Sequence, residues 1–264
     1  MFAFMVKIAF LHFDCLTGPI SRNLRNLAAG IRQAAVQGAE WVLAPELAVQ
    51  GYHFTVSGKP YTIREDIEAE LEPLLCAVRE SGIYLFLGTA VRDRVSHLPH
   101  NSCLVISPEG KIIGRHDKGL VHAPAEAWAT PGKENHCVAC DGYRVGILVC
   151  ADAWYDKNGA ALGGLGAEAI VVVAAWPPGC GGPPEKAWER CSMASGGRPV
   201  LVCNQTGRDE RMNCCIANSA VIVDGHIQMS YQGEPAILLA EMDLQTGAHP
   251  AENFTVLPFR EARS

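Results

Sequence analysis

A cysteine ends an apolar run in the stretch Val145-Gly146-Ile147-Leu148-Val149-Cys150-Ala151-Asp152. The aliphatic residues of this run predict a buried strand, and a polar turn follows the cysteine. Ligands of α/β proteins bind at the carboxyl ends of strands, so the Cys150 thiol lies where a nucleophile would act. The backbone N–H groups just beyond it, beginning with that of Ala151, are placed to bind an oxyanion. Taken alone, a cysteine at a strand end is more commonly a packing residue.

Two charged residues occupy similar positions earlier in the chain. Glu46 directly follows Pro45, which ends a predicted buried strand at residues 41–44. Burial raises the pKa of a carboxyl group, and a general base for a thiol requires that change. Lys118 ends a predicted hairpin strand, and a cation beside a thiol lowers the thiol pKa and stabilises a developing oxyanion. Each residue alone also fits an ordinary surface position.

Strand and helix patterns alternate on both sides of these residues. Helical spacing predicts a helix from Ser21, as its N-cap, to Gly38, and two more over residues 65–81 and 185–195. Segments rich in glycine and proline predict loops at residues 157–166 and 176–184. Hairpin turns are predicted at residues 108–110, 141–142 and 224–225, and strands at 6–13, 41–44, 83–91, 101–107, 111–116, 143–149, 170–174, 200–203 and, as the last strand, 237–242. The alternation predicts mixed sheets covered by helices in a single domain over residues 1–264.

Several motifs in a fixed order indicate that Glu46, Lys118 and Cys150 belong to one site. Pro45-Glu46 is followed by Gly51-Tyr52, Lys118 is followed by Leu120, Glu126 and Pro131-Gly132, and the third motif contains Cys150. Further matching stretches are Ala174-Ala175-Trp176-Pro177, Trp188 and Asn204-Gln205-Thr206-Gly207. In this order the sequence resembles the nitrilase superfamily of carbon–nitrogen hydrolases, from about residue 6 to residue 243.

The resemblance implies a fold and a chemistry. The fold is a four-layer α-β-β-α sandwich, in which two mixed β-sheets are flanked by helices, and relatives pair through a helical face as homodimers. Glu46 is implied as general base, Cys150 as nucleophile, and Lys118 with the Ala151 N–H as oxyanion donors. Glu126 would orient Lys118 or the substrate. A thioester forms and is hydrolysed, and neither a metal nor an organic cofactor is required.

The sequence departs from the family pattern after the nucleophile. Ala151 stands where an aromatic residue is usual, and residues 153–157 lack the common aromatic-Pro-Glu run. Leu120 replaces a histidine, although His122 stands two residues further on. Because these positions help to form the pocket, substrate preference does not transfer. Tyr52, Trp154 and Trp176 are candidates for the pocket wall, and core packing is the alternative for each.

Composition narrows the function classes. A formal charge of −6 argues against a nucleic-acid binder, which would show a basic patch. Apolar runs are shorter than the roughly 20 residues that span a bilayer, and residues 1–13 lack the features of a signal peptide. Eleven cysteines, mostly in apolar runs, indicate reduced thiols in the cytoplasm. Cys137 and Cys140 lack the second ligand pair that a zinc site would need.

We therefore expect an amidase or N-carbamoyl-amide hydrolase that acts on a small molecule. A true nitrilase, a catalytically silent binding or regulatory protein, and a glutaminase that feeds ammonia to a synthetase remain alternatives. The predicted pocket loops are residues 58–63, 121–130 and 176–184, and their composition names no ligand. Arg208 or Arg211 would suit a substrate carboxylate, but a solvated loop position is the better explanation for both.

Overall fold

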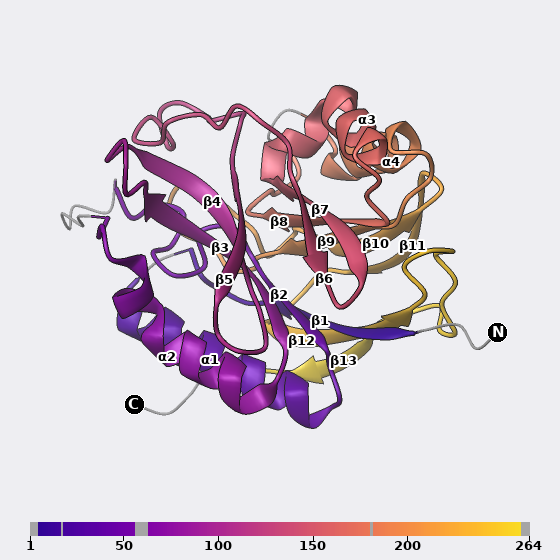
Figure 1. Cartoon of the computed structure of the whole chain (residues 1–264), viewed down its shortest axis with the longest axis horizontal. Helices are drawn as coiled ribbons and strands as arrows, with labels where there is room; N and C mark the ends of the chain where they lie inside the picture. The colour runs from indigo at the N-terminus through magenta and orange to yellow at the C-terminus, as the bar shows by residue number, and fades with distance from the viewer. Residues whose placement is uncertain (1–4, 17, 56–62, 180–181, 260–264) are drawn as a thin grey trace.

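The computed structural model describes residues 5–16, 18–55, 63–179 and 182–259, and Figure 1 shows their arrangement. The elements are, in chain order, β1 (Val6–His12), α1 (Ile20–Val36), β2 (Trp41–Ala44), α2 (Ile67–Ser81), β3 (Tyr84–Arg92), β4 (Pro99–Ile106), β5 (Ile112–Asp117), β6 (Cys137–Cys140), β7 (Tyr143–Val149), η1 (Cys150–Trp154), α3 (Asp156–Gly164), β8 (Ala169–Ala174), α4 (Pro184–Ala194), β9 (Val200–Asn204), β10 (Ser219–Val223), β11 (His226–Tyr231), β12 (Ala236–Met242) and β13 (Thr255–Pro258).

The described strands form two mixed sheets. One has seven strands in the order β13-β12-β1-β2-β3-β4-β5, and the other has six in the order β11-β10-β9-β8-β7-β6. In each sheet three neighbouring strands are parallel, β1-β2-β3 in the first and β7-β8-β9 in the second, with antiparallel strands outside them. Parallel strands carry their carboxyl ends to one edge, so each sheet presents such an edge to a site.

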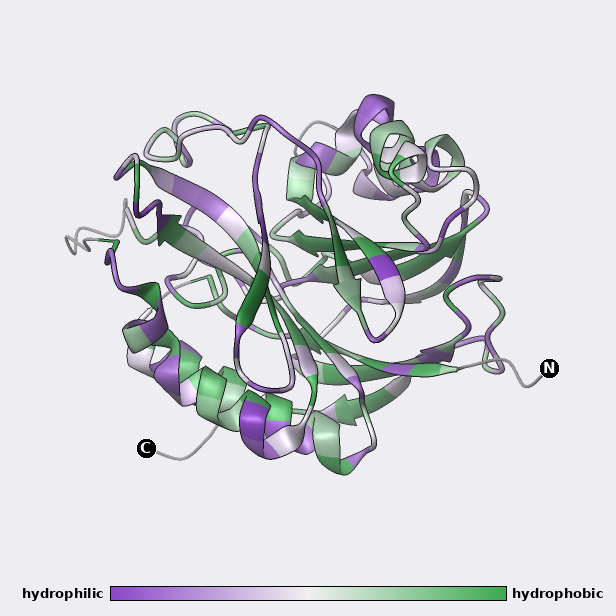
Figure 2. Cartoon of the chain, viewed as in Figure 1, coloured by the Kyte–Doolittle hydropathy of each residue, from purple (hydrophilic) through white to green (hydrophobic). Residues whose placement is uncertain are grey.

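The two sheets face each other, and helices cover their outer faces (Figure 1). Successive side chains of a strand point to opposite faces. In β1, Ile8 and Phe10 join the core between the sheets, whereas Ala9 and Leu11 pack beneath α1 and α2. The helices α3 and α4 cover the second sheet, and the apolar strands run through the middle of the molecule in Figure 2. The predicted α-β-β-α sandwich is confirmed.

Most predicted elements are confirmed to within two residues, but three predictions are wrong. The helix predicted to be capped by Ser21 begins at Ile20 after Pro19, which makes no side-chain cap. Residues 157–166 were predicted to be a loop, yet α3 occupies most of them. Strand β12 is followed by β13, a largely exposed edge strand paired with β12.

Helix α3 forms against its glycine content because those glycines pack on α4. A Cβ at Gly159 would lie 2.6 Å from the Cys191 carbonyl oxygen, and one at Gly163 would lie 2.6 Å from that of Ser195. Glycine costs about 1 kcal/mol in a helix interior, so the close packing of the two helices outweighs propensity. Local sequence could not reveal this contact.

Part of the predicted pocket wall lies outside the described residues, namely 58–62 of the 58–63 loop and 180–181 of the 176–184 loop. Within the described ranges, no helix combines the length and the apolar character needed to cross a membrane.

Candidate active site

The site lies where the carboxyl ends of parallel strands from the two sheets meet. Glu46 follows β2 of the first sheet, Cys150 follows β7 of the second, and Ala175 follows β8. The Glu46 N–H lies 3.4 Å from the carbonyl oxygen of Ala174, so the two sheets touch at this point. Within the first sheet, glycine at position 88 of β3 lets the Pro45-Glu46 backbone lie close to that strand, because a Cβ there would collide with the Pro45 carbonyl oxygen.

Lys118 is the centre of a fully buried charge cluster. Its Nζ donates to Glu46 Oε1 at 2.8 Å and to Glu126 Oε1 at 2.5 Å. All three side chains are buried completely. Lys118 follows β5, and its N–H donates to the Asn101 carbonyl at 2.8 Å, which extends the β4–β5 ladder by one residue. Buried ions are tolerated when they are paired in this way.

Glu46 is held by donors on both of its oxygens. Oε1 accepts from Lys118 and from Asn101 Nδ2 at 2.8 Å, and Oε2 accepts from the Ala175 N–H at 2.9 Å. Burial raises the pKa of Glu46 although Lys118 opposes the change, and the nearby negative charge of Glu126 adds to the rise. The predicted rise is confirmed, and it moves this carboxyl group toward the neutral range in which general bases work.

Glu126 has the opposite balance. Burial would raise its pKa, but Lys118, the His122 N–H and the Tyr52 hydroxyl together lower it. Tyr52 donates its hydroxyl proton to Oε1 at 2.8 Å, and the His122 N–H donates to Oε2 at 2.9 Å. Burial alone would lower the pKa of Lys118, yet Glu46, Cys150 and Glu126 hold it well above its ordinary value. The ammonium therefore stays charged.

Cys150 sits on a strained turn between β7 and η1. Its φ is +49°, in the left-handed region that costs a non-glycine residue of order 1–3 kcal/mol. The thiol is buried, and Glu46 and Lys118 are the charged groups that act on it most strongly. The sequence predicts that Lys118 lowers the pKa of the thiol, and Lys118 does act in that direction. Burial and the negative charge of Glu46 raise the pKa of Cys150 well above its ordinary value, and Lys118 offsets only part of the rise.

The structure thus brings together Glu46, Lys118, Glu126, Tyr52 and Cys150, with Ala151 next along η1. The two tryptophans lie differently. Trp176 is buried, packs edge-on against Trp188 and joins Asn204 through its N–H and carbonyl groups. Trp154 is half-buried between Trp176 and the Arg190 guanidinium, 5.1 Å from the ring centroid. These contacts fit the packing alternative for Trp154.

The remaining candidates lie elsewhere. Arg208 and Arg211 are exposed, and Cys137 and Cys140 both belong to the edge strand β6. Across the residues that the structure describes, no group of three or more potential metal ligands gathers.

Sequence reasoning missed Asn101, which contacts Glu46 through its side chain and Lys118 through its carbonyl oxygen. No motif marks it. The predicted hairpin carried the signal, because the pairing of Ser102 with Asp117 sets Asn101 opposite Lys118. If this strand register is continued by one residue, it places the side-chain amide of Asn101 at the site.

A four-layer α-β-β-α sandwich with a buried thiol, two carboxylates and an ammonium at the junction of its sheets is the arrangement expected of a carbon–nitrogen hydrolase. The family model described as carbon-nitrogen hydrolase matches residues 17–249, and the chain belongs to this family.

Individual proteins show the same likeness. A nitrilase of Pyrococcus abyssi is 30% identical over 169 residues, which are 63% of this chain and 63% of that protein's length. An omega-amidase of Xenopus laevis is 25% identical over 272 residues, covering 97% of this chain and 94% of the relative. The crystal structure of an amidase from Nesterenkonia sp. has a TM-score of 0.80 at 20% identity, covering 91% of each chain.

Proposed function

We propose that the protein is a cysteine-dependent amidase or N-carbamoyl-amide hydrolase that cleaves a non-peptide carbon–nitrogen bond of a small molecule. One observation carries the proposal: a single buried ammonium, Lys118, bridges two carboxylates, and one of these, Glu46, lies with Lys118 beside the buried Cys150 thiol, where both charges act on it. A thiol, a base and a cation within mutual contact supply the groups for acyl transfer.

The first half of the proposed reaction forms a thioester. Glu46 accepts the Cys150 proton while sulfur attacks the carbonyl carbon of the amide. The C=O electron pair moves onto oxygen, and Lys118 and the Ala151 N–H stabilise this oxyanion. The oxyanion collapses, the C–N bond breaks, and Glu46 returns the proton to the leaving nitrogen as ammonia or an amine departs.

The second half regenerates the thiol. Water gives a proton to Glu46 as its oxygen attacks the thioester carbon, and the same oxyanion site stabilises the second tetrahedral intermediate. The C–S bond then breaks, and sulfur recovers the proton from Glu46. The raised pKa values of thiol and base suit this cycle, because the resting thiol ionises only as it attacks.

Cys150→Ala tests the proposal directly. Ammonia release would be measured against a panel of small amides, carbamoyl amides, glutamine and nitriles, with wild type and C150A side by side. We expect release from at least one amide by the wild type and none by C150A, with unchanged thermal unfolding. Cys203→Ala is the matched control, because that thiol is also buried but donates to backbone carbonyl oxygens, those of Leu43 and Leu11. Equal turnover in C150A contradicts the proposal.

A nitrilase is the second candidate, favoured by the nitrilase of Pyrococcus abyssi among the relatives. Turnover of the nitriles and not the amides would select it. A silent binding or regulatory protein is disfavoured because all four charged or nucleophilic positions are retained. Glutamine in the panel tests the glutaminase alternative.

A thiol-directed probe gives an independent measurement. The amidase of Nesterenkonia sp., in one solved variant, carries the acetamide moiety of fluoroacetamide on its active-site cysteine. For this chain we expect iodoacetamide to modify Cys150 faster than its other thiols, read by peptide mass spectrometry. Equal labelling of Cys150 and exposed Cys215 would argue against an activated nucleophile.

We further propose that Tyr52, Ala151 and Trp176 line the substrate pocket, with Trp154 behind them. Residues 1–264 are proposed to act as one domain, in a homodimer, in the cytoplasm. The ten cysteines in the described ranges are free, as a reducing compartment would keep them.

A further inference from the structure

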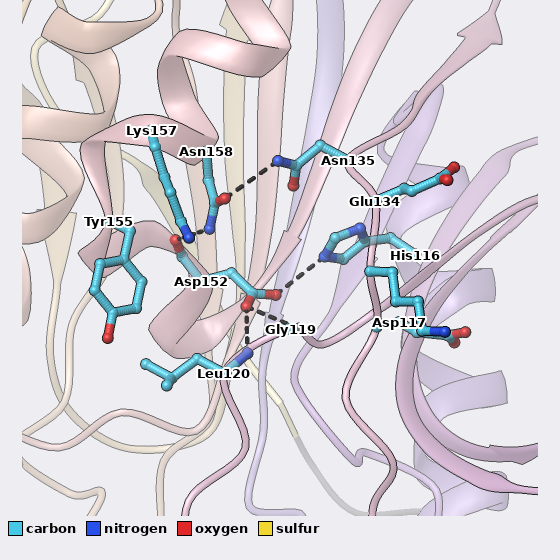
Figure 3. A pocket seen from close by; sticks show the side chains of 12 residues that line it. His116, Asp117, Gly119, Leu120, Glu134, Asn135, Asp152, Tyr155, Lys157 and Asn158 are labelled. Carbon is cyan, nitrogen blue, oxygen red and sulfur yellow. Dashed lines mark hydrogen bonds and ion pairs between the residues drawn. The ribbon is translucent and has the colours of Figure 1, made fainter.

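The Asp152 side chain lies behind the charge cluster, two residues beyond Cys150, and uses all of its accepting capacity. Oδ1 accepts from the Gly119 N–H at 3.0 Å and from the Leu120 N–H at 2.9 Å. Oδ2 accepts from His116 Nε2 at 3.0 Å and from the Val149 N–H at 3.3 Å. Figure 3 shows the carboxylate between His116 and the 119–120 segment, and Asp152 is among the residues that line a cavity of about 410 Å³.

These contacts join the two sheets. Val149 and Asp152 flank the nucleophile at the end of β7, in the six-stranded sheet. His116 belongs to β5 of the seven-stranded sheet, and Gly119 and Leu120 directly follow Lys118. Lys118 is otherwise tied by its backbone to Asn101 and Gly132. Asp152 adds the link between the lysine segment and the cysteine turn.

The carboxylate is ionised despite its burial. Asp152 is 1% exposed, and burial alone would raise its pKa, but His116, the Leu120 N–H and Lys118 together lower it. A buried anion is stable only when donors saturate it. Four donors saturate the Asp152 carboxylate here. The carboxylate in turn holds each of these donors in place.

We propose that Asp152 is a positioning residue that sets the distance between the two oxyanion donors, the Lys118 ammonium and the Ala151 N–H. The inference rests on the proposed function. One donor comes from each sheet, and transition-state stabilisation depends on their common geometry. A shift of about 1 Å between such groups can cost on the order of a hundredfold in rate.

Asp152→Asn breaks the link while keeping the side-chain shape. An amide has one accepting oxygen, so its NH₂ group must face either the 119–120 N–H pair or the Val149 N–H. We expect turnover per active site to fall about a hundredfold. Alkylation of Cys150 by iodoacetamide, a displacement that forms no oxyanion, should stay within threefold of wild type. A loss of fold would lower both rates together.

Two further variants complete the test. Glu134→Gln changes an exposed carboxylate of the same cavity and should leave both rates unchanged. His116→Asn removes one donor of the four and should lower turnover about threefold to tenfold, again without slowing alkylation. If D152N fails to fold, the H116N result decides whether Asp152 is a positioning residue.

Turnover within threefold of wild type in D152N, or in H116N should D152N not fold, overturns the inference. In a variant that keeps the wild-type thermal midpoint, a parallel fall of turnover and alkylation also overturns it. These results leave the proposed function standing, because the wild type is active in both cases. A wild type that hydrolyses no amide or nitrile contradicts the proposed function and this inference with it.

Discussion

Glu46 and Glu126 lie on opposite sides of one ammonium and differ in what surrounds them. Both are buried and both bind Lys118, yet the pKa of Glu46 is raised and that of Glu126 is lowered. Glu46 faces a thiol that can share its proton, whereas Glu126 faces a tyrosine hydroxyl and a backbone N–H that only donate. The same cation therefore accompanies a carboxyl group suited to proton transfer and one suited to anchoring.

Glu46→Gln should produce the largest effect on this comparison. An amide cannot accept the thiol proton or activate water, and general acid–base catalysis contributes about 10²–10⁴ in rate. We expect kcat to fall by about that factor in the ammonia-release assay. The substitution keeps the side-chain shape, but its NH₂ group must face the Lys118, Asn101 or Ala175 donors, so the thermal midpoint is measured alongside and kcat is compared on folded protein.

Glu252→Gln, at an exposed loop position, is the matched control and should change nothing. If E46Q retains a tenth or more of wild-type kcat, Glu46 is not the base, and the contrast between the two carboxylates loses its chemical meaning.

Glu126→Gln should cost less, about tenfold to a hundredfold in kcat. Lys118 keeps its ion pair with Glu46, so a cation remains at the oxyanion site, but one of its two anchors is lost. The expected ranking, E46Q well below E126Q, is read from kcat under saturating substrate. Equal losses would mean that both carboxylates serve one role.

The pH dependence separates the two roles more sharply. Activity requires ionised Glu46, so kcat/KM should fall about tenfold per pH unit below its pKa, with a midpoint above the ordinary glutamate value of about 4.3. The negative charge of Glu126 contributes to raising that pKa. Removal of the charge in E126Q lowers it, so the acid limb should move to lower pH. A limb that stays or moves upward contradicts the electrostatic account.

The sequence could predict the strands from local patterns, whereas the convergence of Glu46, Lys118 and Cys150 followed from the order of motifs that resembles the nitrilase superfamily. The sequence could not predict how burial changes the pKa values of these groups once the segments that carry Glu46, Lys118 and Cys150 meet. The lowering effect of Lys118 on the pKa of Cys150 is predictable, but the larger rise caused by burial and Glu46 depends on the assembled site. Helix α3 could not be predicted for the same reason, because the packing of Gly159 against α4 is a tertiary contact.

Tyr52→Phe should give the smallest effect. It removes the hydroxyl that donates to Glu126 Oε1 at 2.8 Å and leaves both carboxylates on Lys118. A hydrogen bond to a charged group contributes about 1.5–3 kcal/mol, so denaturant unfolding should show a loss of that size, while kcat falls less than tenfold. Tyr231→Phe is the control, because its hydroxyl donates to the Glu234 carbonyl near the surface and should contribute about 1 kcal/mol or less. If Y52F loses no more stability than Y231F, Lys118 and the His122 N–H hold Glu126 without help from the tyrosine. The difference between Glu126 as anchor and Glu46 as base would then depend only on that backbone N–H and the Lys118 ammonium.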